Sequence, residues 1–122
     1  MKIKEFEDYL REIGQRVEVV TGSDNQEYVT VRDAEIPQGG LKGTRCDVAI
    51  LRNGGEPYVP PAAIHTRPAL VEMTMTEPIK TQASAIGPEW QYWSRRFDRP
   101  CIPQILWAHI MTVLSDPRWK PK

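Results

Sequence analysis

One stretch, residues 89–114, constrains the fold of this 122-residue chain more than any other. It opens with tryptophans, a tyrosine and arginines, whose aromatic rings carry a large apolar area that must be buried. Pro103 then stands where the first residue of a helix is expected. Apolar residues follow at helical spacing: Ile102, Ile105, Leu106, Ile110, Val113 and Leu114. The stretch therefore predicts an aromatic, arginine-rich loop that leads into a helix packed on the core.

The first half of the chain has the pattern of a helix followed by strands. Residues 2–13 place apolar side chains on one face and charged ones on the other, and Gly14 is a natural end for that helix. Alternating, β-branched and aromatic residues then predict strands. These predicted strands are residues 17–20, 27–32, 45–51 and 69–75.

Two connections complete the expected architecture. Residues 54–61 are rich in glycine and proline, and proline lacks the amide donor of a sheet ladder, so a rigid loop is expected there. Residues 81–87 are small and polar, which predicts a flexible connection. We therefore predict a single α+β domain over residues 1–122. It has an N-terminal helix, an antiparallel meander of about four strands, a proline-rich loop and a C-terminal helix packed on the sheet.

Composition argues against several classes of function. Charged residues make up 26% of the chain and the net charge is zero, so a nucleic-acid partner is not expected. Residues 89–122 carry six basic and three acidic side chains, a local charge of +3 that suits an acidic protein surface. The longest apolar runs fall short of the roughly 20 residues of a membrane span, and acids at the N-terminus do not fit a signal peptide. We expect a cytoplasmic protein with no membrane partner.

Cysteine and histidine numbers give no indication of a metal or another cofactor. The chain has two cysteines and two histidines, without the spacing of a zinc site or a disulfide framework. We therefore predict no metal and no cofactor. Cys46 alternates with apolar residues in a predicted strand, so we expect it to be buried and inert.

Several strings resemble the ubiquitin-conjugating enzyme fold. Tyr58-Val-Pro-Pro61 is similar to its tyrosine–proline loop, and residues 98–102 with the helix and the Asp116-Pro117 that follow resemble its Trp-x-Pro-x-Ile segment, final helix and closing Leu-x-x-Pro. CDVAIL, HTRPAL and WQYWSRR more narrowly resemble the prokaryotic ubiquitin-conjugating family E. Genes of that family typically lie beside genes for ubiquitin-like proteins, an activating enzyme and a metallopeptidase of the JAB type. The resemblance implies a ubiquitin-like protein and its activating enzyme as partners.

The chain departs from that family pattern at the expected catalytic position. In a typical conjugating enzyme, a His-Pro-Asn triplet and the thioester cysteine lie between the fourth strand and the tryptophan loop. Here residues 73–90, MTMTEPIKTQASAIGPEW, contain no cysteine and no asparagine. The resemblance is then compatible with an atypical or catalytically silent variant, which the empty position favours, or with an active thioester carrier that uses Cys101. A small interaction module of a larger assembly unrelated to ubiquitin is a further alternative.

The catalytic candidates are Cys101 and His65. Cys101 lies where the final helix begins, and a helix N-terminus lowers the pKa of a thiol. The alternative is that Cys101 is a small apolar core residue. His65 falls near the family's active-site loop, where a neutral imidazole can orient a carbonyl or a nucleophile. The alternative is a hydrogen bond to the backbone, and a packing role is expected for His109.

The partner-binding candidates are Tyr58, Trp90, Ser94, Arg95 and Arg96. Arginine binds carboxylates through two parallel hydrogen bonds, so the arginines can hold an acidic surface or the C-terminal tail of a protein partner. The alternative is that one arginine braces the tryptophans by a cation–π contact. Nucleophilic catalysis by Ser94 would need a base that the sequence does not place beside it. Lys2, Lys4 and Arg11 on the first helix resemble the surface offered to an activating enzyme, or are solvated charge.

Overall fold

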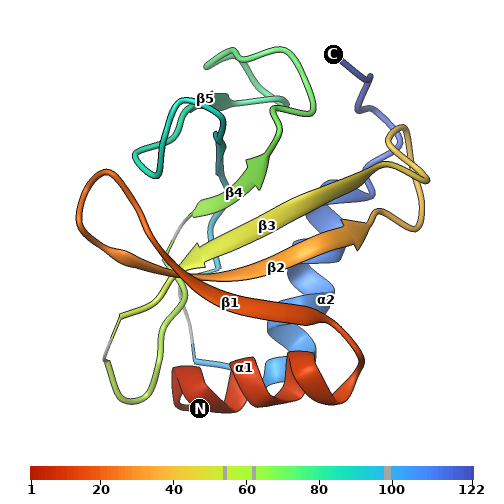
Figure 1. Ribbon diagram of the computed structural model, residues 1–122. Coiled ribbons are helices and arrows are strands. Elements are labelled where there is room, and N and C mark those ends of the chain that lie inside the picture. Colours follow the sequence, from red (N-terminus) through yellow and green to blue (C-terminus); the bar gives the residue numbers. More distant parts are fainter. Residues whose placement is uncertain (54, 62, 98–99) are drawn as a thin grey trace.

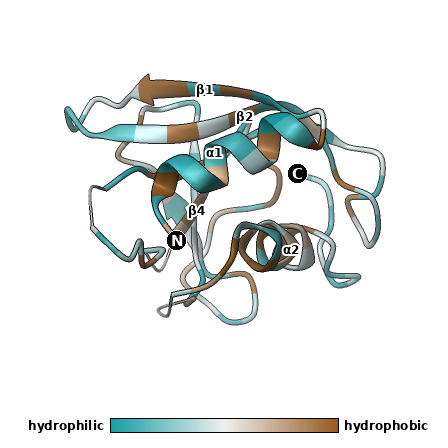
Figure 2. Cartoon of the chain, turned by 90° about the horizontal axis from the view of Figure 1, so that it is seen from below, coloured by the Kyte–Doolittle hydropathy of each residue, from teal (hydrophilic) through white to brown (hydrophobic). Residues whose placement is uncertain are grey.

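The computed structural model describes residues 1–53, 55–61, 63–97 and 100–122. These residues form two helices and a six-stranded sheet in the order β1-β2-β3-β4-β6-β5, in which each neighbouring pair is antiparallel. The elements are α1 (Ile3–Glu12), β1 (Arg16–Thr21), β2 (Glu27–Glu35), β3 (Arg45–Leu51), β4 (Ala63–Arg67), β5 (Thr81–Ala83), β6 (Gln91–Ser94) and α2 (Pro103–Leu114). In Figure 1, α2 lies behind the sheet and α1 crosses below it; Figure 2 shows both helices on the same side of β1 and β2.

The core lies between the sheet and the helices. The apolar face of α1 buries Phe6 and Leu10, and α2 buries Leu106, Ile110 and Leu114. These side chains form one apolar cluster with residues of β2, β3, β4 and β6. Burying a side chain of this size stabilises the fold by about 1.5–3 kcal/mol.

The helix predictions are confirmed, with a correction to the apolar stripe of α2. Ile102 and Ile105 are 54% and 49% exposed, whereas the sequence predicts that both pack on the core. Ile102 precedes the helix in an extended conformation. Ile105 lies about 100° around the helix from Leu106, because an α-helix has 3.6 residues per turn. The buried face is the row of Leu106, Ile110 and Leu114.

The first three predicted strands are confirmed as β1, β2 and β3. The fourth is wrong: residues 69–75 contain no strand, and β4 comes earlier, ending at Arg67 before Pro68. The predicted loop around Trp90 and Trp93 includes β6, and the predicted flexible connection includes β5. The sheet therefore has six strands instead of about four. The predicted proline-rich loop stays a prediction, since residue 54 lies outside the described part of the chain.

The short strands are difficult to recognise in the sequence because they bury polar residues. His65 and Thr66 lie in β4, and Gln91 begins β6, yet all three are buried. A strand that buries polar side chains lacks the apolar alternation by which strands are recognised. Its stability depends on hydrogen-bond partners from other segments.

The described residues also bear on membrane association. No helix among them combines the length and the apolar character that crossing a bilayer requires.

Candidate functional site

The segment between β4 and β6, residues 68–90, is where the resemblance places the catalytic chemistry. Its two ends lie side by side, because β4 pairs directly with β6 from Ala63 opposite Ser94 to Thr66 opposite Gln91. Its middle folds back as β5, which pairs with β6 at the edge of the sheet. The strand β6 is therefore flanked by β4, which precedes the segment, and by β5, which belongs to it.

Gln91 fixes this segment from inside. Its side chain is fully buried, and its Oε1 accepts the N–H of Leu70 at 2.8 Å. Its Nε2 donates to the carbonyl of Val71 at 2.9 Å and to Oγ1 of Thr81 at 3.0 Å. One amide therefore ties the start of the segment to both β5 and β6.

His65 and Ser84 meet across the sheet. Nδ1 of His65, in β4, lies 2.8 Å from Oγ of Ser84, which follows β5 directly. Oγ of Ser84 also accepts the N–H of Ile86 at 3.1 Å. Oγ keeps a second lone pair, so this bond is compatible with either direction of the His65 contact; we assign the tautomer in which the hydroxyl of Ser84 donates to Nδ1. This assignment places the ring hydrogen on Nε2.

The imidazole of His65 is held neutral by its surroundings. It is 4% exposed and packs edge-on against Tyr28 and Tyr92, with ring centroids 5.2 and 5.3 Å away. Burial lowers the pKa of His65 to about 4, against a smaller opposing effect of Asp24. At neutral pH, a lone pair of the ring therefore remains available to accept the hydroxyl hydrogen of Ser84. Ser84 itself is half-buried, so solvent reaches the serine while the histidine is enclosed.

Arg67 holds the end of the same segment. Its Nε and Nη2 donate to Oδ2 of Asp47 at 2.9 and 2.8 Å. Its guanidinium lies 4.6 Å from the ring centroid of Trp90, and its Nη1 lies 3.7 Å from Glu89. Burial alone would raise the pKa of Asp47, but hydrogen bonds from the Asp33 N–H and from Arg67 lower it below the ordinary value. Trp90, a predicted partner-binding residue, is buried beneath this arginine.

The two cysteines differ in environment. Cys46 is 4% exposed in β3, as predicted, and burial raises the pKa of its thiol to about 12. Cys101 is half-buried just before α2 and packs against the edge of the apolar cluster. Its thiol lies close enough to Tyr58 to add to the effect of burial in raising the pKa of that phenol. The structure thus places the two catalytic candidates in different surroundings: His65 contacts Ser84, and Cys101 neighbours Tyr58.

The predicted partner-binding residues have mixed exposure. Tyr58 is fully buried, and its hydroxyl donates to the carbonyl of Leu51 at 2.6 Å. Ser94 is half-buried and Arg96 is exposed. Their part in partner binding stays a prediction, and burial limits Tyr58 and Trp90 to an indirect part in it.

Arg95 braces the aromatic residues. Its guanidinium lies 5.7 Å from the ring centroid of Trp93 and 5.5 Å from that of Trp119. The same group donates to four backbone carbonyls, those of Ser94, Ile79, Pro78 and Lys80, at 2.7, 2.7, 3.0 and 3.3 Å. Burial lowers the pKa of Arg95. These hydrogen bonds fix Arg95 to the turn that precedes β5.

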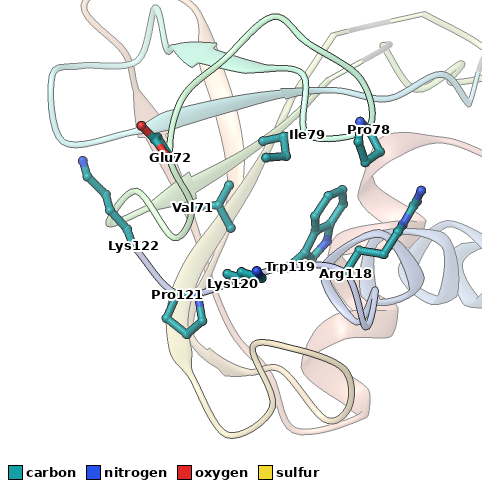
Figure 3. Close-up of a pocket in the computed structure, with 9 residues that line it drawn as sticks. All are labelled: Val71, Glu72, Pro78, Ile79, Arg118, Trp119, Lys120, Pro121 and Lys122. Atoms are coloured by element: carbon teal, nitrogen blue, oxygen red, sulfur yellow. The ribbon is translucent and has the colours of Figure 1, made fainter.

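A pocket of about 680 Å³ is lined in part by that turn, through Pro78 and Ile79 (Figure 3). Val71, Ile79 and Trp119 surround its apolar interior, and Arg118 and Lys122 stand at opposite sides of it. The remaining lining residues are Glu72, Pro78, Lys120 and Pro121. Arg95 forms part of the support of this pocket, since Pro78, Ile79 and Trp119 all contact its guanidinium.

The sequence did not indicate Ser84 or this pocket. Ser84 is a serine in the region where a cysteine is expected, which is the signal that could have indicated it. The pocket combines segments that lie far apart in the sequence, and no local pattern predicts it. Among the residues that the structure describes, no group of three His, Cys, Asp or Glu side chains is placed to hold a metal ion.

Comparison with known proteins gives one match. The model of a family described as Prokaryotic E2 family E matches residues 3–116, which include every helix and strand. No curated protein and no solved structure was found to match the chain.

Proposed function

Because the chain belongs to the Prokaryotic E2 family E, we propose that it acts in a ubiquitin-like protein conjugation system as an atypical or catalytically silent conjugating-enzyme variant. In this role it binds a ubiquitin-like protein or its activating enzyme and carries no thioester. The observation that carries the proposal is the position of its cysteines. Neither of them lies in the segment between β4 and β6.

The environment of each thiol supports this reading. A thioester carrier needs an exposed thiolate, since the thiolate is the attacking species. Cys46 is buried, and its raised pKa keeps it protonated at neutral pH. Cys101 packs against the edge of the core. Its place before α2 is the observation that favours the second candidate function, an active carrier that uses Cys101.

The pocket in Figure 3 is the proposed contact for the ubiquitin-like protein. Arg118, Lys120 and Lys122 outnumber Glu72 among its charged lining residues, so its rim carries a net positive charge. Arg118 is paired with Asp116 at 2.7 Å, which leaves Lys120 and Lys122 as the principal cations for a partner. A rim of this charge around an apolar interior fits an acidic segment with apolar side chains. Charge complementarity of this kind contributes mainly to specificity and to the rate of association.

The activating enzyme has a separate proposed contact on α1. Lys4 and Arg11 both lie within ion-pair distance of Asp8, and Lys2 lies 3.4 Å from Glu56. Exposed ion pairs of this kind contribute little to stability. These cations are therefore available to a partner at little cost.

The test combines the purified protein with a candidate ubiquitin-like protein and a candidate activating enzyme from the same genome, with and without ATP. We expect a complex in size-exclusion chromatography and no adduct that thiols cleave. Lys120→Glu/Lys122→Glu should weaken binding of the ubiquitin-like protein at least about tenfold, the equivalent of about 1.4 kcal/mol. The matched control, Lys42→Glu on the exposed loop between β2 and β3, should not weaken it.

Other outcomes would assign a different function. A thiol-cleavable adduct that Cys101→Ser abolishes would establish the active carrier. If Lys2→Glu/Lys4→Glu loses binding of the ubiquitin-like protein and the pocket variant does not, the contact for that protein lies on α1 and not at the pocket. Absence of any complex with either protein would favour an interaction module unrelated to ubiquitin.

A further inference from the structure

We propose that Ser84 is a nucleophile that accepts acyl groups from activated esters and thioesters, with His65 as its general base. This inference goes beyond the proposed function, which requires binding alone. It rests on the contact between the two side chains and on their different exposure.

The distance between the two side chains meets the requirement for a nucleophile and its general base. A base must lie within hydrogen-bond reach of the hydroxyl, about 2.6–3.2 Å between heavy atoms. The distance from Nδ1 of His65 to Oγ of Ser84 is 2.8 Å. The ring cannot turn away freely, because Tyr28 and Tyr92 enclose it edge-on. The hydroxyl therefore stays aligned with its base.

The position of Ser84 makes it accessible to a substrate. It follows β5, which lies at the edge of the sheet in the part of the chain that the structure describes and pairs there with β6. Its neighbour Ala85 is exposed, and Ser84 itself is half-buried. An acyl donor can thus approach from solvent while His65 stays enclosed.

The environment of His65 also selects the class of substrate. A neutral imidazole is ready to take a proton at neutral pH, but its low pKa makes it a weak base. A weak base activates the hydroxyl only slightly, so the attack needs a reactive carbonyl that carries a good leaving group. We therefore expect reaction with thioesters and activated esters, and none with amides.

The proposed step is an acyl transfer. Oγ of Ser84 forms a bond to the carbonyl carbon of the thioester while its hydroxyl proton passes to Nδ1 of His65. The tetrahedral intermediate then collapses, the carbon–sulfur bond breaks, and the leaving thiolate takes the proton from Nδ1. The products are an ester on Ser84 and a free thiol, so no oxidant or reductant is required.

A purely structural role for the pair is the competing explanation. The hydroxyl of Ser84 caps the N–H of Ile86 and satisfies a buried histidine, and both roles require no reactivity. The two explanations differ in whether Ser84 reacts faster than a serine that has no base.

The experiment treats the folded protein with 4-nitrophenyl acetate and, separately, with a fluorophosphonate, and locates the adduct by peptide mass mapping. Neither reagent involves a protein partner, so the result is independent of the proposed function. We expect modification of Ser84 about 100-fold faster than that of Ser94, in line with the contribution of a general base. Ser84→Ala should abolish the adduct, and the matched control Ser94→Ala should retain it.

Two further variants test the base. His65→Gln, shown to be folded by circular dichroism, should lose most of the reactivity of Ser84. Since replacement of a buried histidine can unfold the protein, Ser84→Cys provides an independent measurement: the introduced thiol should react with iodoacetamide faster than that of Cys101 in the same molecule. Three results would each overturn the proposal: modification of Ser84 at the rate of Ser94, a folded His65→Gln variant with wild-type reactivity, or an introduced thiol in Ser84→Cys that reacts no faster than Cys101.

Discussion

The indole N–H of Trp93 donates a hydrogen bond to Oγ1 of Thr66 at 2.9 Å, and both side chains are fully buried. This bond joins β6 to β4, the two strands between which the segment that carries Ser84 lies in the sequence. The ring of Trp93 also packs at 67° against Trp119, with centroids 5.6 Å apart. Trp93 therefore links the sheet to the chain that follows α2.

We expect Trp93→Ala to lower the free energy of unfolding by about 3–5 kcal/mol, as large-to-small core substitutions do. Trp93→Phe keeps most of the apolar volume but leaves Thr66 without this donor, so a smaller loss of about 1–3 kcal/mol is expected. Urea denaturation followed by circular dichroism measures both. Equal losses in the two variants would show that the hydrogen bond, and not the ring volume, dominates.

Gln91→Ala should destabilise the protein by about 3 kcal/mol, because it leaves several buried backbone and hydroxyl groups without their partner. The amide protons of Leu70 and Val71 should also exchange faster with solvent. Gln82→Ala, on the exposed face of β5, is the matched control and should change neither quantity. Unchanged exchange at Leu70 in the Gln91 variant would contradict the proposed tie.

Arg95→Ala should lower stability, since the turn before β5 loses four hydrogen bonds from one guanidinium. Arg95→Lys should not restore it, because an ammonium cannot reproduce the planar fork. Arg16→Ala, at an exposed position in β1, should leave the melting temperature unchanged. A stable Arg95→Ala protein that binds its partner weakly would instead make Arg95 a recognition residue.

Stability should fall on acidification between about pH 6.5 and pH 4 because of His65. The unfolded chain binds a proton at His65 below its ordinary pKa of 6.5, whereas the folded protein binds it only below about 4. Since the unfolded state holds more protons in this window, acid favours unfolding there. At about 1.36 kcal/mol per unit of pKa, the expected loss is about 2–3 kcal/mol by about pH 4.5.

Urea titrations at about pH 7 and about pH 4.5 measure this loss. His65→Gln should reduce the difference between the two pH values. Burial also lowers the pKa of His109, so His109→Gln is the matched comparison. An unchanged pH difference in the His65 variant, with a reduced one in the His109 variant, would assign the effect to α2.

Local pattern was sufficient for much of the fold. The periodicity of α1 and the alternation of β1, β2 and β3 record which face of each element is buried, and this is why Cys46 was correctly predicted to point inward. The family was likewise recognisable from short strings, and its match extends over residues 3–116.

Tertiary structure alone decided the second half of the sheet and the contacts around it. The strands β4, β5 and β6 have five, three and four residues, too short for a periodic signal, and β4 and β6 bury His65, Thr66 and Gln91. Buried polar groups require partners, and these partners come from distant segments. His65 was a candidate from the sequence, but Ser84 lies 19 residues further along, and only the pairing of β4, β6 and β5 brings the two together. The sequence gives the chemical type of each residue. The fold determines which neighbours it contacts and therefore what it can do.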